Sequence, residues 1–390
     1  MDRQQDIWKG AKELLSEIKL HGFEGYIVGG AVRDYLLNGP VNDIDIATDA
    51  RPAEIERMYP KTAALGKKHG TILVLHRGLP YEVTTFRGKN DESSTLSADL
   101  EKRDFTMNAM ALTGDELVID PFGGKKDLER GLIRGVKDPN ARILEDPLRM
   151  IRAFRFIAQY DFLIEPQTKN AIRCLAKELD NTAAERIGSE WGKILTGPYS
   201  QRALNDFFTC LPLTSLRKDL FPENWEIPDS WEPVVRVEGE VQSWAAFLLI
   251  MNEQEPGFRL KKWKRSNSLQ KKVKQVMFWS CWRKANEWTN EALYRAGKTA
   301  ALAAEELYGV FFKKNDAWSK EELHARFDSF PIASREDLSV NGSELAEALE
   351  RTPGPWISEC LKELETAVIN SKVRNCKEDL ITWIKEQMDP

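Results

Sequence analysis

The chain has 390 residues, 30% of them charged, and a formal net charge of −5. This length allows a sizeable core and more than one domain. The acidic total excludes a protein that coats nucleic acid over its whole surface, although it is compatible with a local basic groove. The sequence contains no apolar stretch of the ~18 residues that a membrane span needs. Residues 1–7 also lack the apolar core of a signal peptide. We therefore expect a cytoplasmic protein without membrane contact.

The first third of the chain mixes helix and strand signals. We expect helices over residues 7–18, 31–37 and 52–59, and strands over residues 26–28, 43–46, 71–76 and 81–86. The last two strands flank a short turn at Arg77-Gly78, which predicts an antiparallel pair and hence a sheet that is at least mixed.

Strand signals fade after about residue 138. Helical periodicity covers residues 145–158, 166–175, 185–195, 241–251 and much of 288–390. Breaks rich in Pro and Gly mark joints near residues 222–233 and 330–342. We therefore expect an α+β fold, with a small mixed-sheet head and an elongated all-α body. The expected parts are a head (1–140), a helical neck (141–200), a helical body (201–330) and a helical tail (331–390).

Three polar features lie close together in the head. Gly29-Gly30 follows a predicted strand, Arg33 lies one turn into the next helix, and Asp43 and Asp45 lie two apart on the following strand. That spacing places both carboxylates on one face, where they could bridge divalent metal ions that hold a triphosphate. Mg²⁺ prefers such hard oxygen ligands. The glycines let backbone N–H groups approach phosphate, and Arg33 can grip phosphate oxygens bidentately.

This constellation resembles motif A of the class II tRNA nucleotidyltransferases, in the polymerase-β-like superfamily. Motif A is carried by residues 28–34 and 43–45, motif B by 103–109, motif C by 120–128, and motif D by 145–149 with 152–156. The resemblance is strong over about residues 22–195 and is closest to the bacterial enzymes. It implies that residues 1–140 form a polymerase-β-like catalytic head and that residues 141–200 recognise the base. It also implies that residues 201–330 and 331–390 bind tRNA, and that Arg103, Arg152 and Arg155 contact the nucleotide.

Asp146 and Arg149 indicate how a base could be read without a template. On a helix, residues three apart share a face, so one side chain accepts a hydrogen bond while the other donates. This pair complements the amino group and ring nitrogen of cytosine or adenine. Guanine or uracil would leave Asp146 facing an acceptor, which costs ~1–3 kcal/mol. The alternative for the pair is a surface ion pair. Glu82 could be a third metal-site acid or a plain strand-surface carboxylate.

A basic run in the body is a candidate contact with the tRNA backbone, because phosphate recognition needs clustered cations. We select Lys261, Lys262, Lys264 and Arg265. A solvated helix face is the alternative.

The segment over residues 87–98 is polar and resembles a shortened form of the flexible loop that this family uses in the final A addition. The chain is therefore most similar to a CC-adding enzyme that uses CTP, and a separate A-adding enzyme would act on the same tRNA. Three alternatives remain: a complete CCA-adding enzyme that uses CTP and ATP, a poly(A) polymerase, and a non-catalytic tRNA-binding protein. Asp43 and Asp45 speak against the last, because a pseudo-enzyme has no need of paired carboxylates.

Overall fold

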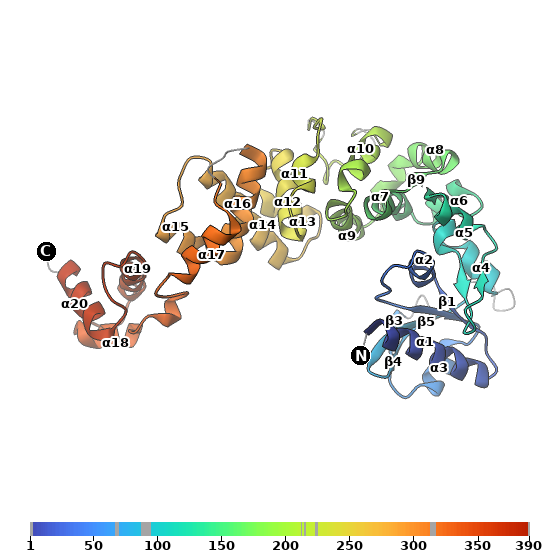
Figure 1. Ribbon diagram of the computed structural model, residues 1–390, viewed down its shortest axis with the longest axis horizontal. Helices are drawn as coiled ribbons and strands as arrows, with labels where there is room; N and C mark the ends of the chain where they lie inside the picture. The colour runs from blue at the N-terminus through green and yellow to red at the C-terminus, as the bar shows by residue number, and fades with distance from the viewer. Residues whose placement is uncertain are drawn as a thin grey trace. The chain divides into compact units, whose positions relative to one another are not determined.

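The computed structural model describes residues 3–66, 70–86, 95–211, 213, 216–222, 225–312 and 317–388. The chain divides into two compact units, Met1–Ile227 and Pro228–Pro390 (Figure 1). Within the described ranges, no helix combines the length and apolar character needed to cross a membrane. The segment on which the CC-adding prediction rests lies outside the described residues over 87–94.

A mixed sheet forms the centre of the head. Its strands in the described part are β1 (Gly25–Val28), β2 (Asp45–Thr48), β3 (Thr62–Gly66), β4 (Thr71–His76), β5 (Leu79–Thr85), β6 (Ala111–Leu112) and β7 (Val118–Ile119). They follow the order β3-β4-β5-β2-β1-β6-β7, with β2 parallel to β5 and the other neighbours antiparallel. Arg77 and Gly78 both have positive φ, as a tight hairpin turn requires. The predicted β4–β5 hairpin is thus confirmed.

The helices of the head are α1 (Arg3–Leu20), α2 (Gly30–Leu36), α3 (Pro52–Met58), α4 (Leu96–Glu101) and α5 (Gly124–Glu129), and α1, α2 and α3 pack against the sheet. In α1 the apolar stripe that includes Ala11, Leu14 and Ile18 is fully buried, as the helical spacing predicts. The strand expected over residues 43–46 begins only at Asp45.

The rest of the first unit is mostly helical. It contains α6 (Pro139–Glu145), α7 (Leu148–Tyr160), α8 (Pro166–Cys174), α9 (Ala184–Leu195), α10 (Ser200–Cys210) and the short strands β8 (Leu132–Ile133) and β9 (Leu163–Ile164). Helices α7, α9 and α10 share an aromatic core, in which the ring of Phe207 lies 5.0 Å from Phe154 and 4.9 Å from Trp191. This core holds α9 beside α7, next to the cavity that contains the candidate active site.

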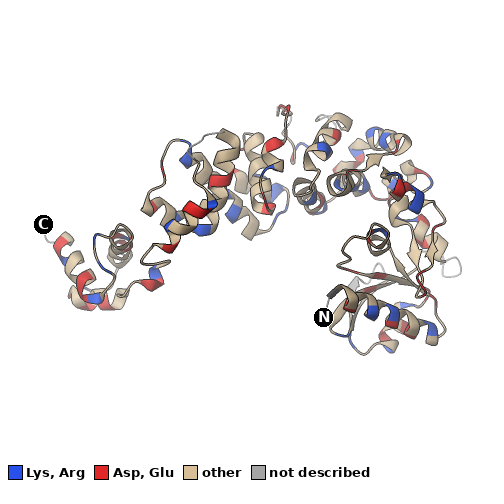
Figure 2. Cartoon of the chain, viewed as in Figure 1, with Lys and Arg blue, Asp and Glu red and all other residues tan. Residues whose placement is uncertain are grey.

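In the second unit, all elements in the described residues are helical. They are α11 (Glu232–Val235), α12 (Glu240–Ile250), α13 (Pro256–Lys262), α14 (Asn267–Arg283), α15 (Asn290–Ala296), α16 (Lys298–Phe312), α17 (Lys320–Asp328), α18 (Gly342–Ala348), α19 (Trp356–Ile369) and α20 (Lys377–Met388). A buried ion pair, Arg283 with Glu305 at 3.2 Å, joins α14 to α16. Charged residues of both signs are spread along the helices (Figure 2). The predicted α+β class, a mixed-sheet head followed by helices, is confirmed.

Candidate active site

One cavity of about 420 Å³ in the first unit brings three of the sequence motifs together. Its lining residues are Gly29, Gly30, Arg33, Asp45, Lys102, Arg103, Asp104, Asn108, Asp146, Arg149, Arg152, Arg155 and Arg186. Every residue that we predicted to contact nucleotide is in this set, and so is the predicted catalytic carboxylate of Asp45. The second predicted carboxylate, Asp43, is exposed and is not among the lining residues.

The chain turns sharply where β1 meets α2. Gly29 has a φ of 73°, a conformation that residues with side chains rarely adopt. A β-carbon at Gly29 would lie 2.6 Å from Nη1 of Arg103. A side chain at residue 29 would therefore require the end of the Arg103 side chain to move.

Arg33 is buried and already held by protein groups. Its Nε and Nη2 each donate to the carboxylate of Asp34 over 2.9 Å, and its Nη1 donates to Oδ1 of Asn108 over 2.7 Å. These bonds use three of the five N–H donors of a guanidinium. Arg33 is therefore oriented before any ligand binds, while its side chain still lines the cavity.

Phe156 of α7 is fully buried and contacts three arginines through its ring. The Cζ atoms of Arg155, Arg33 and Arg152 lie 4.0, 5.3 and 5.8 Å from the ring centroid. These distances suit cation–π attraction. One apolar ring thus gathers guanidinium groups from α2 and α7 at the same wall of the cavity.

Buried carboxylates pair with two of the three arginines of α7, Arg152 and Arg155. Asp104 accepts hydrogen bonds from Nε of Arg152 over 2.8 Å and from Nδ2 of Asn108 over 2.9 Å. Burial alone would raise the pKa of Asp104, but the charge of Arg152 and these hydrogen bonds outweigh it and hold the pKa well below its usual range. Glu190 of α9 pairs with Nε of Arg155 at 2.7 Å. Burial lowers the pKa of Arg155, whereas Asp104 raises that of Arg152.

The prediction that Asp146 and Arg149 share one helix is wrong. Helix α6 ends at Glu145 and α7 begins at Leu148, and Asp146 between them has extended backbone angles of −150° and 98°. The cause is Pro147, because a proline disfavours helical angles in the residue before it. Asp146 therefore lies at the joint, and Arg149 lies in the first turn of α7.

The side chains of Asp146 and Arg149 both line the cavity but have other partners. Arg186 donates to both carboxylate oxygens of Asp146, over 3.1 and 2.8 Å. Arg149 donates to the carbonyl oxygens of Lys102 and Arg142 over 2.6 and 2.8 Å. The structure therefore brings an acceptor and a donor to one cavity, each held by its own neighbours.

Asp45 offers carboxylate oxygens at the cavity, and two further exposed carboxylates, Asp43 and Glu82, lie near it in the fold. Ile44 and Ile46 are buried while Asp43 and Asp45 are exposed, so the predicted alternation holds even though Asp43 precedes the strand. In the parallel ladder Asp45 is the Cα partner of Glu82, which is also exposed.

These carboxylates fit a divalent ion whose remaining ligands come from the substrate. Within the described residues, no group of three or more His, Cys, Asp or Glu side chains gathers in a way that could hold a metal. Mg²⁺ is usually held by one or two carboxylates together with waters and substrate phosphates. A carboxylate of Asp45 at the cavity, beside candidate phosphate ligands, matches that pattern.

Sequence reasoning missed two residues of α9, Arg186 and Glu190. They are four apart, so they lie on one face of the helix, where they meet Asp146 and Arg155. The sequence did contain one signal for them, because two residues of opposite charge lie four positions apart within a predicted helix. The distant partners could not be read from it.

The basic residues chosen in the second unit lie at the end of α13 and just beyond it. Lys261, Lys262 and Lys264 are exposed, whereas Arg265 pairs with Glu240 at 3.1 Å. Trp263 between them is fully buried and belongs to the core. Three of the four selected cations are therefore accessible.

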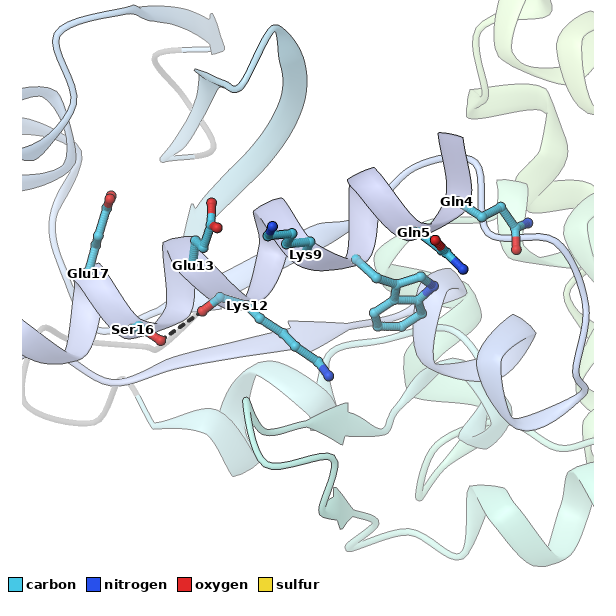
Figure 3. Close-up of a pocket in the computed structure, with 8 residues that line it drawn as sticks. Gln4, Gln5, Lys9, Lys12, Glu13, Ser16 and Glu17 are labelled. Atoms are coloured by element: carbon cyan, nitrogen blue, oxygen red, sulfur yellow. Dashed lines mark hydrogen bonds between the residues drawn. The ribbon is translucent and has the colours of Figure 1, made fainter. Parts of the chain in front are cut away.

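A larger hollow of about 740 Å³ lies along α1 (Figure 3). Its lining residues are Gln4, Gln5, Trp8, Lys9, Lys12, Glu13, Ser16 and Glu17. All belong to one helix, and none is a predicted site residue. The smaller cavity, in contrast, is lined by residues from several helices and strands, so it is the better candidate for an active site.

Three family profiles match the chain: the Poly A polymerase head domain at residues 25–134, a probable RNA and SrmB-binding site of polymerase A at 161–223, and a putative tRNA nucleotidyltransferase domain 2 at 235–384. A CCA-adding enzyme of Bacillus cytotoxicus is 37% identical over 97% of this chain and 98% of its own, and one from Bacillus mycoides is 34% identical over 97% and 98%. The crystal structure of the Bacillus stearothermophilus CCA-adding enzyme in complex with CTP is 34% identical, with a TM-score of 0.84, covering 100% of this chain and 98% of that one. The chain therefore belongs to the tRNA nucleotidyltransferases, the enzyme family of the CCA-adding enzymes.

Proposed function

We propose that this protein is a complete CCA-adding enzyme, which transfers two CMP and one AMP from CTP and ATP to the 3′ end of tRNA and releases pyrophosphate. Relatives that match over nearly their full length are named CCA-adding enzymes, which favours this alternative over addition of CC alone. The proposal therefore needs no separate A-adding enzyme.

The observation that carries the proposal is that one cavity holds a carboxylate and a guanidinium beside the phosphate-binding candidates. Asp146 would accept a hydrogen bond from the amino group of cytosine or adenine. Arg149 would donate to the adjacent ring nitrogen, N3 or N1. Guanine and uracil present a carbonyl oxygen in place of the amino group and would leave Asp146 unpaired, at a cost of ~1–3 kcal/mol. The hydrogen bonds of Arg149 to two carbonyl oxygens support this role, because they orient its guanidinium before the nucleotide binds.

The remaining residues of the cavity would hold the triphosphate and the reacting groups. Arg33 and Arg103 would bind phosphate oxygens, and Gly30 would let the backbone come close to them. Asp43 and Asp45 would hold Mg²⁺ through their carboxylate oxygens. When bound there, Mg²⁺ supplies charge neutralisation on the triphosphate and activation of the attacking 3′-hydroxyl.

In the second unit, we propose that Lys261, Lys262 and Lys264 contact tRNA phosphates. Their exposure at the end of α13 supports this role. The ion pair of Arg265 with Glu240 makes that residue a weaker candidate.

Nucleotide incorporation on defined RNA ends tests the proposal. Three tRNA transcripts, lacking CCA or ending in C or CC, are incubated with CTP, ATP or both. We expect CTP alone to complete CC, ATP alone to extend only the CC transcript by one residue, and both to give CCA. A stop after CC in the presence of ATP would restore the CC-adding prediction, and long adenosine runs would indicate a poly(A) polymerase. Absence of any extension would indicate a tRNA-binding protein without transfer activity.

A further inference from the structure

Tyr160 is the last residue of α7 and reaches from that helix to α2. Its hydroxyl donates to Oδ1 of Asp34 over 2.7 Å, across 126 positions of sequence. Helix α7 also carries Arg149, Arg152 and Arg155, whereas α2 carries Arg33. One hydroxyl therefore connects α7, which carries the candidate base-reading residue Arg149, with α2, which carries the candidate phosphate ligand Arg33.

The contact acts on Arg33 through Asp34. The carboxylate of Asp34 receives Nε and Nη2 of Arg33, and its Oδ1 also receives Tyr160. A carboxylate that is fixed by a third donor can hold the plane of the guanidinium more firmly.

The ring of Tyr160 adds a second contact with the same guanidinium. Cζ of Arg33 lies 5.1 Å from its centroid, and the ring stacks on Phe156 at 6.2 Å and 20°. Burial raises the pKa of Tyr160 to about 12, so the hydroxyl remains a donor at neutral pH.

We propose that Tyr160 is a positioning residue for nucleotide binding. Through Asp34 it holds the Arg33 guanidinium toward the triphosphate, and it links the position of that guanidinium to α7. The inference rests on the proposed function, because it takes the triphosphate of CTP or ATP as the ligand of Arg33. Since every nucleoside triphosphate carries the same three phosphates, the effect of Tyr160 is independent of the base.

A similar arrangement in the second unit provides a matched control. Tyr294 donates to Oε1 of Glu365 over 2.7 Å, and Arg335 donates to Oε2 over 3.0 and 2.7 Å. It contains the same three chemical groups, and none of its members lines the candidate active site. Tyr294→Phe therefore reports what the loss of such a hydroxyl does to stability alone.

The experiment measures equilibrium binding of CTP and ATP to the full chain with Mg²⁺ and without tRNA. Tyr160→Phe should weaken both nucleotides by the same factor, about fivefold, because one charge-assisted hydrogen bond is lost. Tyr160→Leu should weaken both further, because it also removes the ring. Inorganic tripolyphosphate, used as a competitor, should lose potency by the same factor. In turnover, KM for each nucleotide should rise while kcat changes less than about twofold.

Tyr294→Phe should lower the melting temperature without changing either dissociation constant. Unchanged nucleotide affinity in Tyr160→Phe, a loss confined to one base, or an equal loss in Tyr294→Phe would overturn the inference. Failure of the unchanged protein to complete CCA would instead overturn the proposed function, and it would leave the binding result intact because that assay contains no tRNA.

Discussion

Arg103 and Gly29 lie so close together that Nη1 of the arginine is 2.6 Å from the position of a β-carbon on the glycine. Gly29→Ala must strain a φ of 73° and also displace Arg103. We expect the free energy of unfolding to fall by about 1 kcal/mol from the strain. We expect kcat/KM for CTP to fall at least about tenfold, because a misplaced phosphate ligand weakens transition-state binding. Steady-state kinetics and denaturant unfolding measure the two effects.

Gly78→Ala is the control for this prediction. Gly78 has a φ of 78°, but a β-carbon there would meet no atom within 4 Å. It should lose similar stability and keep its activity. Equal loss of activity in both variants would show that backbone strain, rather than the displacement of Arg103, is responsible.

Asp43→Asn and Asp45→Asn should each lower kcat for nucleotide transfer by at least about a thousandfold, because an amide is a poor ligand for a hard divalent ion. Fold and tRNA affinity should be nearly unchanged, since both side chains are exposed. Single-turnover incorporation over a Mg²⁺ titration measures the effect. Glu82→Gln tests whether the neighbouring carboxylate participates. Appreciable turnover of either aspartate variant at saturating Mg²⁺ would disprove the metal assignment.

Arg149→Ala should relax base selection in addition to slowing addition. Loss of the donor makes the match to cytosine worse, so the preference for CTP over UTP should fall about tenfold, the value of one to two hydrogen bonds. Competition between CTP and UTP on a tRNA that lacks CCA measures the ratio. Arg186→Ala, which removes the partner of Asp146, should alter the same ratio. An unchanged ratio in both variants would contradict the templating role.

Asp104→Asn should destabilise the protein by about 3 kcal/mol at neutral pH, because it removes the nearest counterion of the partly buried Arg152. The native pKa of Asp104 lies below its unfolded value near 4, so its contribution is complete at pH values above about 5. The contribution is lost as pH falls below 4. The difference in unfolding free energy between wild type and variant should therefore shrink in acid. Urea denaturation at several pH values provides the measurement, and a constant difference down to pH 3 would contradict it.

The local parts of the site could be predicted from sequence. The turn at Gly29, the alternating exposure of residues 43–46 and the β4–β5 hairpin depend on neighbours within a few residues, and the structure shows each of them. The break at Asp146 also has a local cause, Pro147. The apolar periodicity across residues 145–158 outweighed that signal and predicted one continuous helix.

The residues that sequence reasoning missed depend on contacts between segments that are distant in the sequence. Arg186 meets Asp146 from 40 positions away, and Tyr160 meets Asp34 from 126. Helical spacing shows that Arg186 and Glu190 share a face, but packing of the aromatic core decides what that face meets. Periodicity carries no information about such partners.

The break between α6 and α7 has a consequence for the two groups that we propose to read the base. If the donor and the acceptor lay on a single helix, the geometry of that helix would fix the distance between them. In this protein the carboxylate is on an extended residue between two helices, and the guanidinium is anchored to carbonyl oxygens in the first turn of the second. A change in the backbone angles of Asp146 would therefore move the carboxylate while the arginines of α7 stay in their helix. The distance between the acceptor and the donor thereby depends on one backbone position, next to a proline.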